Sequence, residues 1–297
     1  MYDIIIVGAG PAGLTAALYA LRANKKVLIL EAKSYGGQII KASKVENYPG
    51  IKLISGFDFA TNLYNQVKDL NGEVKYETVL RIDENKNVTT NKGTYNAKAI
   101  IIATGSDNRK LNIEGEKEYI GKGVSYCATC DGNFFKGKTV AVIGGGNAAF
   151  EDVIYLSNLA SKVYLIHRRD EFRATEKEQE EVNSLNNVEI IINAVVKRII
   201  GSELVTGIEI STGDSDRIID VDGVFISVGQ EPKNDIFKNI VDLDKLGYIE
   251  SADGVHTKVQ GIYVAGDTRQ KELRQLTTAC SDGSIAATIA IREMNNK

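Results

Sequence analysis

The feature that most constrains the fold of this chain is a glycine-rich turn between a β-branched strand and a helix. The first copy predicts a strand over residues 2–7, the turn GAGPAG at 8–13 and a helix to about residue 23. Residues 27–31 then predict a second strand, which ends in the acid Glu31. This order of elements is typical of one βαβ unit whose two parallel strands are buried on both faces.

The same order of elements occurs a second time. It predicts a strand at 139–143, the turn GGGNAA at 144–149, a helix over 150–160 and a strand at 162–167. The first glycines of the two turns are 136 residues apart. This distance indicates a duplicated domain rather than a short repeat.

Two further strands, each followed by a glycine, are predicted at 99–103 and 262–265. The later one comes after the second βαβ unit, so we expect it to return to the sheet of the first domain. The second domain, residues 113–243, is then an insertion between the two segments of the first, 1–112 and 244–297. The predicted fold class is α/β, with two Rossmann-like, doubly wound, three-layer dinucleotide-binding domains.

The length of 297 residues is sufficient for two such domains. Charged residues make up 25% of the chain and the formal net charge is −3, which favours neither nucleic-acid nor anionic-membrane binding. Residues 4–21 carry no charge, but Asp3 precedes them and the glycine turn interrupts them, so we predict neither a membrane span nor a signal peptide. With three cysteines, the chain is expected to be soluble and cytoplasmic.

The first glycine turn predicts a dinucleotide site. Its glycines let a pyrophosphate approach the backbone amides at the N-terminus of the helix, where the helix dipole favours an anion. Glu31 lies 23 residues after Gly8, where a carboxylate can bind the ribose hydroxyls of an adenine dinucleotide. The alternative is a turn that only packs the helix closely against the sheet.

The second turn predicts a different nucleotide, because no acid ends its second strand. That strand runs into HRRDEFRA at 167–174, and Arg168 lies 24 residues after Gly144. Guanidinium groups at this place match a ribose 2′-phosphate, which indicates NADP; the alternative is a solvated basic surface. Two dinucleotide sites in one chain suggest electron transfer between two cofactors. The first site is therefore predicted to bind FAD.

Cys127 and Cys130 form a C-x-x-C pair close enough to make a disulfide. A zinc site is disfavoured because no second such pair is present, so we predict no metal and a redox-active pair, with an inert structural disulfide as the alternative. Asp131 is either a proton donor in this chemistry or the N-cap of a helix. Cys280, on a predicted C-terminal helix, is expected to be a buried thiol, although a modulating role is also open.

These residues make the chain resemble the low-molecular-weight, bacterial-type thioredoxin reductases, which belong to the FAD- and NADPH-dependent pyridine nucleotide-disulfide oxidoreductases. The resemblance covers essentially the whole length. Its motifs are GAGPAG at 8–13, GGQ at 36–38, ENYPG at 46–50, ATG at 103–105, CATCDG at 127–132, GGGNAA at 144–149, HRRDEFRA at 167–174, AGD at 265–267 and RQ at 274–275.

The resemblance implies a homodimer that passes electrons from NADPH through FAD to the Cys127–Cys130 disulfide and on to thioredoxin or a thioredoxin-like protein. It implies that Cys130 lies against the flavin, that Cys127 attacks the partner's disulfide and that Asp131 donates a proton. The implied FAD contacts are Gly8, Gly10, Gly13, Glu31, Gly37, Gln38, Asn47, Asp267, Arg274 and Gln275. The implied NADPH contacts are Gly144, Gly146, Asn147, Ala148, Arg168, Arg169 and Arg173.

Several other functions agree less well with these motifs. The flavoprotein reductase of a peroxiredoxin system normally has an extra N-terminal domain, and no residues precede Met1 to form one. A ferredoxin-dependent flavin thioredoxin reductase would be expected to lack the arginines of HRRDEFRA, and a ferredoxin–NADP reductase would lack CATC. A dithiol oxidase would have little use for the arginines, and nothing in the sequence requires a non-catalytic NADP sensor.

Overall fold

The computed structural model describes residues 1–42, 44–213, 215–251 and 254–296. These residues form two compact units. The first unit contains residues 1–107 and 231–297, and the second contains residues 108–230. The second unit is thus inserted in the sequence of the first, as the strand pattern predicts.

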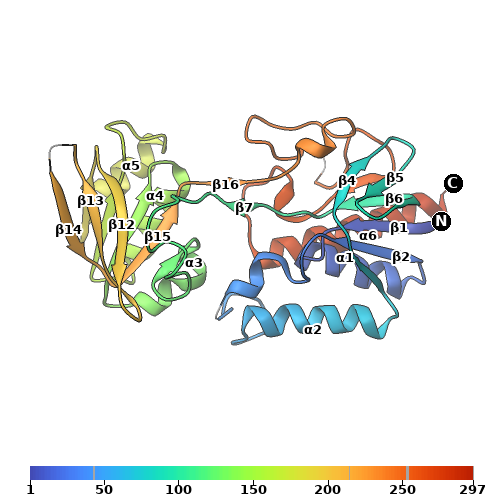
Figure 1. Cartoon of the computed structure of the whole chain (residues 1–297), viewed down its shortest axis with the longest axis horizontal. Coiled ribbons are helices and arrows are strands. Elements are labelled where there is room, and N and C mark those ends of the chain that lie inside the picture. Colours follow the sequence, from blue (N-terminus) through green and yellow to red (C-terminus); the bar gives the residue numbers. More distant parts are fainter. Residues whose placement is uncertain (43, 214, 252–253, 297) are drawn as a thin grey trace. The chain divides into compact units, whose positions relative to one another are not determined.

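The first unit is built on a seven-stranded sheet with the order β3-β2-β1-β6-β5-β4, and β17 also pairs with β6 (Figure 1). The strands β3, β2, β1, β6 and β17 are parallel, whereas β4 and β5 extend the sheet with antiparallel pairing. The strands are β1 (Tyr2–Val7), β2 (Val27–Glu31), β3 (Glu73–Tyr76), β4 (Val79–Ile82), β5 (Asn87–Thr90), β6 (Thr94–Ile102) and β17 (Ile262–Val264).

The pairing of β17 with β6 returns the C-terminal segment to the first sheet. Ile262 lies opposite Ile100 and Val264 lies opposite Ile102, in a parallel register. Both strands are buried runs of apolar residues, which suits strands covered on both faces. The prediction that the second domain is an insertion is therefore confirmed.

One face of this sheet is covered by helices and the other by strands and loops. The helical face packs small residues of α1 and α6 closely together, including Ala16, Ala17 and Ala286. On the opposite face, Phe237 and Val241 pack against residues of β4 and the sheet. The helices are α1 (Pro11–Arg22), α2 (Gly56–Asp69) and α6 (Leu276–Asn295), with 3-10 turns η1 (Gly37–Lys41), η3 (Asp235–Phe237) and η4 (Gly266–Thr268).

The second unit repeats this plan with a five-stranded parallel sheet of order β11-β10-β9-β15-β8. Its helices cover one face and a three-stranded antiparallel sheet, β12-β13-β14, covers the other. The strands are β8 (Val124–Ser125), β9 (Thr139–Gly144), β10 (Lys162–Ile166), β11 (Val188–Ile191), β12 (Val195–Gly201), β13 (Val205–Ser211), β14 (Asp216–Asp220) and β15 (Gly223–Ser227). The helices are α3 (Ala128–Asp131), α4 (Asn147–Ser157) and α5 (Glu176–Asn183), with the 3-10 turn η2 (Gly132–Phe135).

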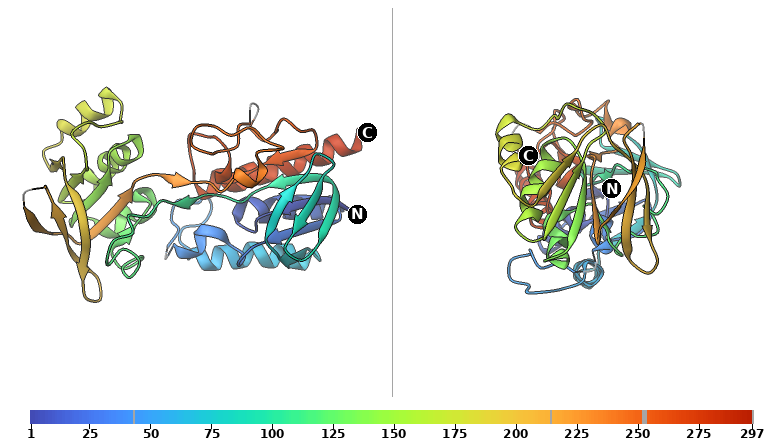
Figure 2. Two further views of the ribbon diagram at one scale, coloured as in Figure 1. Left: turned by 45° about the horizontal axis from the view of Figure 1, so that its top comes forward. Right: turned by 90° about the vertical axis from the view of Figure 1, so that its left-hand side faces the viewer.

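The chain passes between the units through β7 (Asp107–Asn108) and β16 (Gln230–Glu231), which pair with each other (Figure 2). The chain therefore passes from one unit to the other between residues 107 and 108 and again between residues 230 and 231. Both positions are earlier than the boundaries at 112/113 and 243/244 that the sequence suggests. The second boundary differs more, because Phe237 and Val241, which the sequence assigns to the second domain, are buried in the core of the first unit. A pattern of polar and glycine residues does not show against which sheet a short apolar segment packs.

Candidate functional site

The first glycine turn joins the carboxyl end of β1 to the N-terminus of α1. Gly8 has a φ of +106°, and a Cβ there would lie 2.3 Å from the carbonyl oxygen of Ala103. A Cβ at Gly13 would lie 1.9 Å from the carbonyl oxygen of Gly8, so the close strand–helix packing itself needs glycine at both positions. Gly10 is different, because a Cβ there would meet only the Cα of Gly37, at 3.9 Å. The side of Gly10 is open to a phosphate at the helix N-terminus.

Glu31, at the carboxyl end of β2, lies beside this turn. Its Oε2 accepts a hydrogen bond of 2.8 Å from the backbone N–H of Ala9. Its Oε1 accepts one of 2.9 Å from the backbone N–H of Lys33. These two bonds hold a carboxylate at the end of the strand next to the glycine turn, where a ribose of a bound dinucleotide would lie.

Three buried side-chain atoms of the first unit make no hydrogen bond within the described part of the chain, and one of them is Nδ1 of His256. The other two belong to residues predicted to contact FAD: Oδ1 of Asp267, which lies 3.4 Å from Lys271 Nζ as an ion pair only, and Nε of Arg274. Burial raises the pKa of the Asp267 carboxyl. Because buried polar groups are nearly always hydrogen-bonded, these two atoms point to a polar ligand. Together with the open glycine turn and Glu31, they fit FAD.

Asp282 of α6 organises the segment that contains Asp267. It is 4% exposed and accepts hydrogen bonds from Arg269 Nε at 2.9 Å, Arg269 Nη2 at 2.8 Å and Lys271 Nζ at 3.1 Å. It also accepts one of 3.0 Å from the backbone N–H of Gly266. Although burial alone would raise its pKa, the Arg269 bonds and the Lys271 charge lower the pKa of Asp282. We name Arg269, Lys271 and Asp282 the buried charge cluster; no motif in the sequence indicates it.

Replacing Asp282 by alanine is expected to destabilise the first unit by about 3–5 kcal/mol, since it leaves two buried cations without their main partner. For a unit of this size, that loss lowers the melting temperature by about 10 °C. Thermal unfolding followed by circular dichroism measures it. Ser281→Ala is the matched control, because Ser281 is the exposed neighbour on the same helix. A melting temperature equal to that of Ser281→Ala would contradict the stabilising role.

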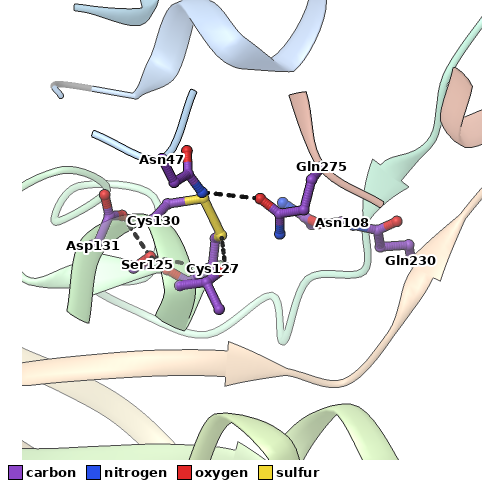
Figure 3. Close-up of a disulfide and its surroundings, with 9 residues drawn as sticks. Asn47, Asn108, Ser125, Cys127, Cys130, Asp131, Gln230 and Gln275 are labelled. Atoms are coloured by element: carbon purple, nitrogen blue, oxygen red, sulfur yellow. Dashed lines mark hydrogen bonds between the residues drawn. A yellow bond between two sulfur atoms is a disulfide. The ribbon is translucent and has the colours of Figure 1, made fainter. Parts of the chain in front are cut away.

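Three other residues predicted to contact FAD have polar partners within the first unit. Asn47 Nδ2 donates a hydrogen bond of 3.1 Å to Gln275 Oε1, which joins two segments 228 residues apart (Figure 3). Gln38 instead donates to Asp107 at 2.6 Å and accepts from Lys41 at 2.7 Å. The structure thus brings Asn47 and Gln275 together, and it engages the side chain of Gln38 elsewhere.

The second glycine turn joins β9 to α4 in the second unit. A Cβ at Gly144 would lie 2.4 Å from the carbonyl oxygen of Ser227, so glycine is needed for packing there. No atom lies within 4 Å of a Cβ placed on Gly146, the N-cap of α4. The helix begins at Asn147, three residues earlier than predicted, which puts Asn147 and Ala148 in its first turn. This open helix N-terminus can receive a pyrophosphate.

The basic loop after β10, residues 167–174, is fixed against this turn. The backbone N–H of Arg173 donates a hydrogen bond of 2.7 Å to the carbonyl oxygen of Gly145. The ring of His167 lies 2.3 Å from where a Cβ on Gly145 would be. Arg168, Arg169 and Arg173 are all exposed. Three guanidinium groups next to the nucleotide turn fit the 2′-phosphate of NADPH.

Cys127 and Cys130 form a disulfide, with their Cα atoms 5.3 Å apart (Figure 3). Cys127 is the N-cap residue of α3, and Cys130 lies within that helix. Ser125, at the end of β8, holds the segment: its Oγ accepts a hydrogen bond of 3.1 Å from the Cys127 backbone N–H. The same hydroxyl donates a hydrogen bond of 2.6 Å to Asp131 Oδ2. None of the sequence motifs includes this serine, although both of its partners lie close to it in the sequence.

Asp131 is the acid closest in sequence to the disulfide. Burial raises the pKa of its carboxyl, and the hydrogen bond from Ser125 partly offsets this effect. The residue stands at the N-cap position of η2, but its side chain makes no capping hydrogen bond. The helix-cap interpretation therefore does not account for Asp131, whereas a carboxyl with a raised pKa suits a proton donor.

Cys280 lies on α6, as the sequence predicts, and is 8% exposed. Burial raises the pKa of its thiol, and hydrogen bonds with Thr15 and Tyr48 offset part of this increase. A buried, protonated thiol is a poor nucleophile. The geometry agrees with the small buried hydrophobe expected from the sequence.

Among the described residues, no helix is both long and apolar enough to cross a membrane.

Comparison with known proteins gives a consistent result. Residues 2–283 match the model of the family described as pyridine nucleotide-disulphide oxidoreductase. The thioredoxin reductase of Listeria monocytogenes is 44% identical over 292 residues, which cover 96% of this chain and 92% of that protein. The thioredoxin reductase of Bacillus subtilis is 43% identical over 296 residues, covering 97% and 93%.

A solved structure agrees with these relatives. The crystal structure of thioredoxin reductase from Streptococcus pyogenes MGAS5005 superposes with a TM-score of 0.95 at 40% sequence identity. The match covers 100% of this chain and 99% of that chain. The predicted fold class, two dinucleotide-binding domains with parallel sheets, is confirmed.

Proposed function

Because the chain belongs to the pyridine nucleotide-disulphide oxidoreductase family, and within it to the thioredoxin reductases, we propose that it reduces thioredoxin or a thioredoxin-like protein with electrons from NADPH. One observation carries the proposal. A single compact unit holds the Cys127–Cys130 disulfide, a half-buried acid with a raised pKa and a glycine turn flanked by three exposed arginines. A purely structural disulfide needs none of these neighbours.

Each cofactor is assigned to one unit. When bound, FAD supplies an acceptor for the hydride of NADPH and a donor of electrons to a disulfide. In the first unit, FAD binding is supported by the open turn at Gly10, by the Glu31 carboxylate beside it, and by the buried atoms of Asp267 and Arg274 that make no hydrogen bond. In the second unit, the open turn at Gly146 and the basic loop support NADPH binding.

The dithiol passes two electrons to the partner by thiol–disulfide exchange. A thiolate of the reduced pair, assigned to Cys127, attacks one sulfur of the partner's disulfide. That S–S bond breaks as the mixed disulfide forms, and the released partner thiolate takes up a proton. Cys130 then attacks Cys127 Sγ, which restores the Cys127–Cys130 bond and frees the second partner thiol. The partner is reduced by two electrons and two protons, and the chain's dithiol is oxidised.

Asp131 is assigned as the acid that exchanges a proton with the active-site sulfur atoms. Its carboxyl is half-buried, and the loss of solvation raises its pKa, so it holds a proton closer to neutral pH than an exposed aspartate does. Ser125 fixes both the carboxylate and the Cys127 amide, which keeps the acid and the disulfide in one arrangement.

An anaerobic titration of the FAD-loaded protein with NADPH tests the proposal. We expect uptake of about four electrons per chain, two by the flavin and two by the disulfide, with NADPH strongly preferred over NADH. Uptake of two electrons would mean that the disulfide does not exchange electrons with the flavin. A flavin that neither nucleotide reduces would favour another electron donor, such as ferredoxin.

A homodimer and a cytoplasmic location complete the proposal, and both follow from the resemblance alone. Size-exclusion chromatography with light scattering tests the first: a mass twice that of the 32.3 kDa chain supports it, and a monomer mass contradicts it. Cell fractionation tests the second.

A further inference from the structure

Lys271 is a buried lysine that lies between two carboxyl groups of the first unit and belongs to none of the sequence motifs. Its side chain is 6% exposed. Its Nζ donates hydrogen bonds to two residues of α6, to Asp282 at 3.1 Å and to Thr278 at 3.3 Å. The same Nζ lies 3.4 Å from Oδ1 of Asp267, in η4. One buried cation is therefore shared by an acid of α6 and an acid predicted to contact FAD.

The two acids depend on this lysine to different degrees. Asp282 also accepts two hydrogen bonds from the guanidinium of Arg269 and one from the backbone N–H of Gly266. Asp267 Oδ1 makes no hydrogen bond among the described residues, and Lys271 supplies the cation of its ion pair. Loss of the Lys271 charge would thus leave Asp282 paired and would leave Asp267 without its ion-pair partner.

Charged groups of both signs act on Asp267. Lys271 and Arg274, which follow it in the chain, favour its ionised form, whereas Asp282 on α6 disfavours it. The helix α1 also packs against η4, but its only charged residue is Arg22, in its last turn. Burial raises the pKa of the Asp267 carboxyl, and the Lys271 charge is the largest effect that opposes this increase. The ionised form of Asp267 therefore depends mainly on Lys271.

Asp267 is open on one side. Its side chain is 31% exposed although Oδ1 is fully buried, so the accessible surface belongs to its other atoms. An ionised carboxyl acts only as an acceptor, and the hydrogen bond that it accepts from a hydroxyl group is about twice as strong as one between neutral groups. The open side of Asp267 is therefore best suited to a hydroxyl donor when the carboxyl is ionised.

We propose that Lys271 is a positioning residue for FAD: it fixes Asp267 against α6 and holds the carboxyl in the ionised form that accepts hydrogen bonds from hydroxyl groups of the cofactor. The Nζ of Lys271 is engaged by Asp282, Thr278 and Asp267, so the lysine acts through Asp267. The inference rests on the proposed contact between Asp267 and FAD.

The test is the rate of FAD release from the loaded full-length protein between pH 5 and pH 9, followed by the rise of flavin fluorescence after dilution into buffer without FAD. Lys271→Met removes the charge and keeps an unbranched side chain. Release accelerates as Asp267 takes up a proton. We expect the midpoint of this acceleration to lie about 1–3 pH units higher in Lys271→Met, because a nearby opposite charge lowers the pKa of a carboxyl by this amount. Below that midpoint the variant should release FAD about tenfold faster.

Further variants separate the charge of Lys271 from its packing. Lys271→Arg keeps the charge and should restore the midpoint of the unmodified protein. Lys238→Met makes the same change at an exposed lysine of the same unit and should also leave the midpoint where it is. Asp267→Asn cannot titrate, so the double variant with Lys271→Met should release FAD at the rate of Asp267→Asn alone, without this pH dependence. The double variant removes both charges of the pair and therefore tests the role even if Lys271→Met alone does not fold.

Each comparison can overturn the proposal. A midpoint of Lys271→Met equal to that of Lys238→Met, or one that Lys271→Arg fails to restore, would contradict the charge effect. Faster FAD release from the double variant than from Asp267→Asn would show that Lys271 does not act through Asp267. Asp267→Asn alone tests the proposed function separately, since release at the unmodified rate would refute the contact between Asp267 and FAD.

Discussion

Cys130→Ser is expected to abolish thioredoxin reduction while FAD remains bound. The substitution removes one partner of the only disulfide in the described part of the chain, and turnover should fall by about 10³-fold or more, since exchange needs both sulfurs. The residues proposed to hold FAD belong to the other compact unit, so flavin content should not change. Steady-state thioredoxin reduction with NADPH measures the loss, and the flavin absorbance band measures retention. In the anaerobic titration, the number of electrons taken up from NADPH should fall from about four per chain to about two.

Cys280→Ala provides the matched control for this loss. Cys280 is buried on α6, has a raised thiol pKa and makes no disulfide, so its replacement should leave turnover within about twofold. Turnover that survives in Cys130→Ser would show that electrons reach thioredoxin by another route. A loss in both variants would place Cys280 in the reaction.

Arg168→Gln is expected to raise KM for NADPH by about 10- to 100-fold and to change KM for NADH little. A charge-assisted hydrogen bond to a phosphate contributes about 1.5–3 kcal/mol, and NADH lacks the 2′-phosphate. The reacting atoms are at the other end of the nucleotide, so kcat at saturation should stay within about twofold. Steady-state kinetics with both nucleotides measure the ratio.

The control for the arginine is Arg217→Gln, an exposed substitution on β14 in the same unit. It removes the same charge away from the nucleotide turn, so it separates a specific phosphate contact from the general field of the protein. Equal effects of the two substitutions on KM for NADPH would contradict the assignment of Arg168. The double variant Arg168→Gln with Arg173→Gln should weaken NADPH binding further, because both guanidiniums belong to the loop fixed against Gly145.

The main elements of the site were predictable because each is a local pattern. The strands β1 and β2 end within the predicted limits, and the turn at residues 8–13 packs as glycine geometry requires. The Cys127–Cys130 pair closes at the short range that its spacing allows. In each case the residues that determine the structure are neighbours in the sequence, so propensity and spacing carry enough information.

The largest difference arises where distant segments meet. The boundary predicted at 243/244 lies at 230/231 in the structure, because Phe237 and Val241 are buried against the first sheet. No local pattern specifies this contact. The helix after the second turn starts at Asn147, since Gly146 itself serves as the N-cap. Asp131 makes no capping bond because Ser125, on an adjacent strand, binds its carboxylate.

The sequence by itself predicted the two nucleotide turns, the insertion of one domain in the other, the redox pair and a basic loop suited to NADP. Only the tertiary structure showed the charged groups that support the first unit, which are the buried charge cluster of Arg269, Lys271 and Asp282. The physical reason is the difference in range. Turns and strands follow from steric and hydrophobic preferences of adjacent residues, whereas a buried ion pair or carboxylate depends on groups that folding brings together from distant positions.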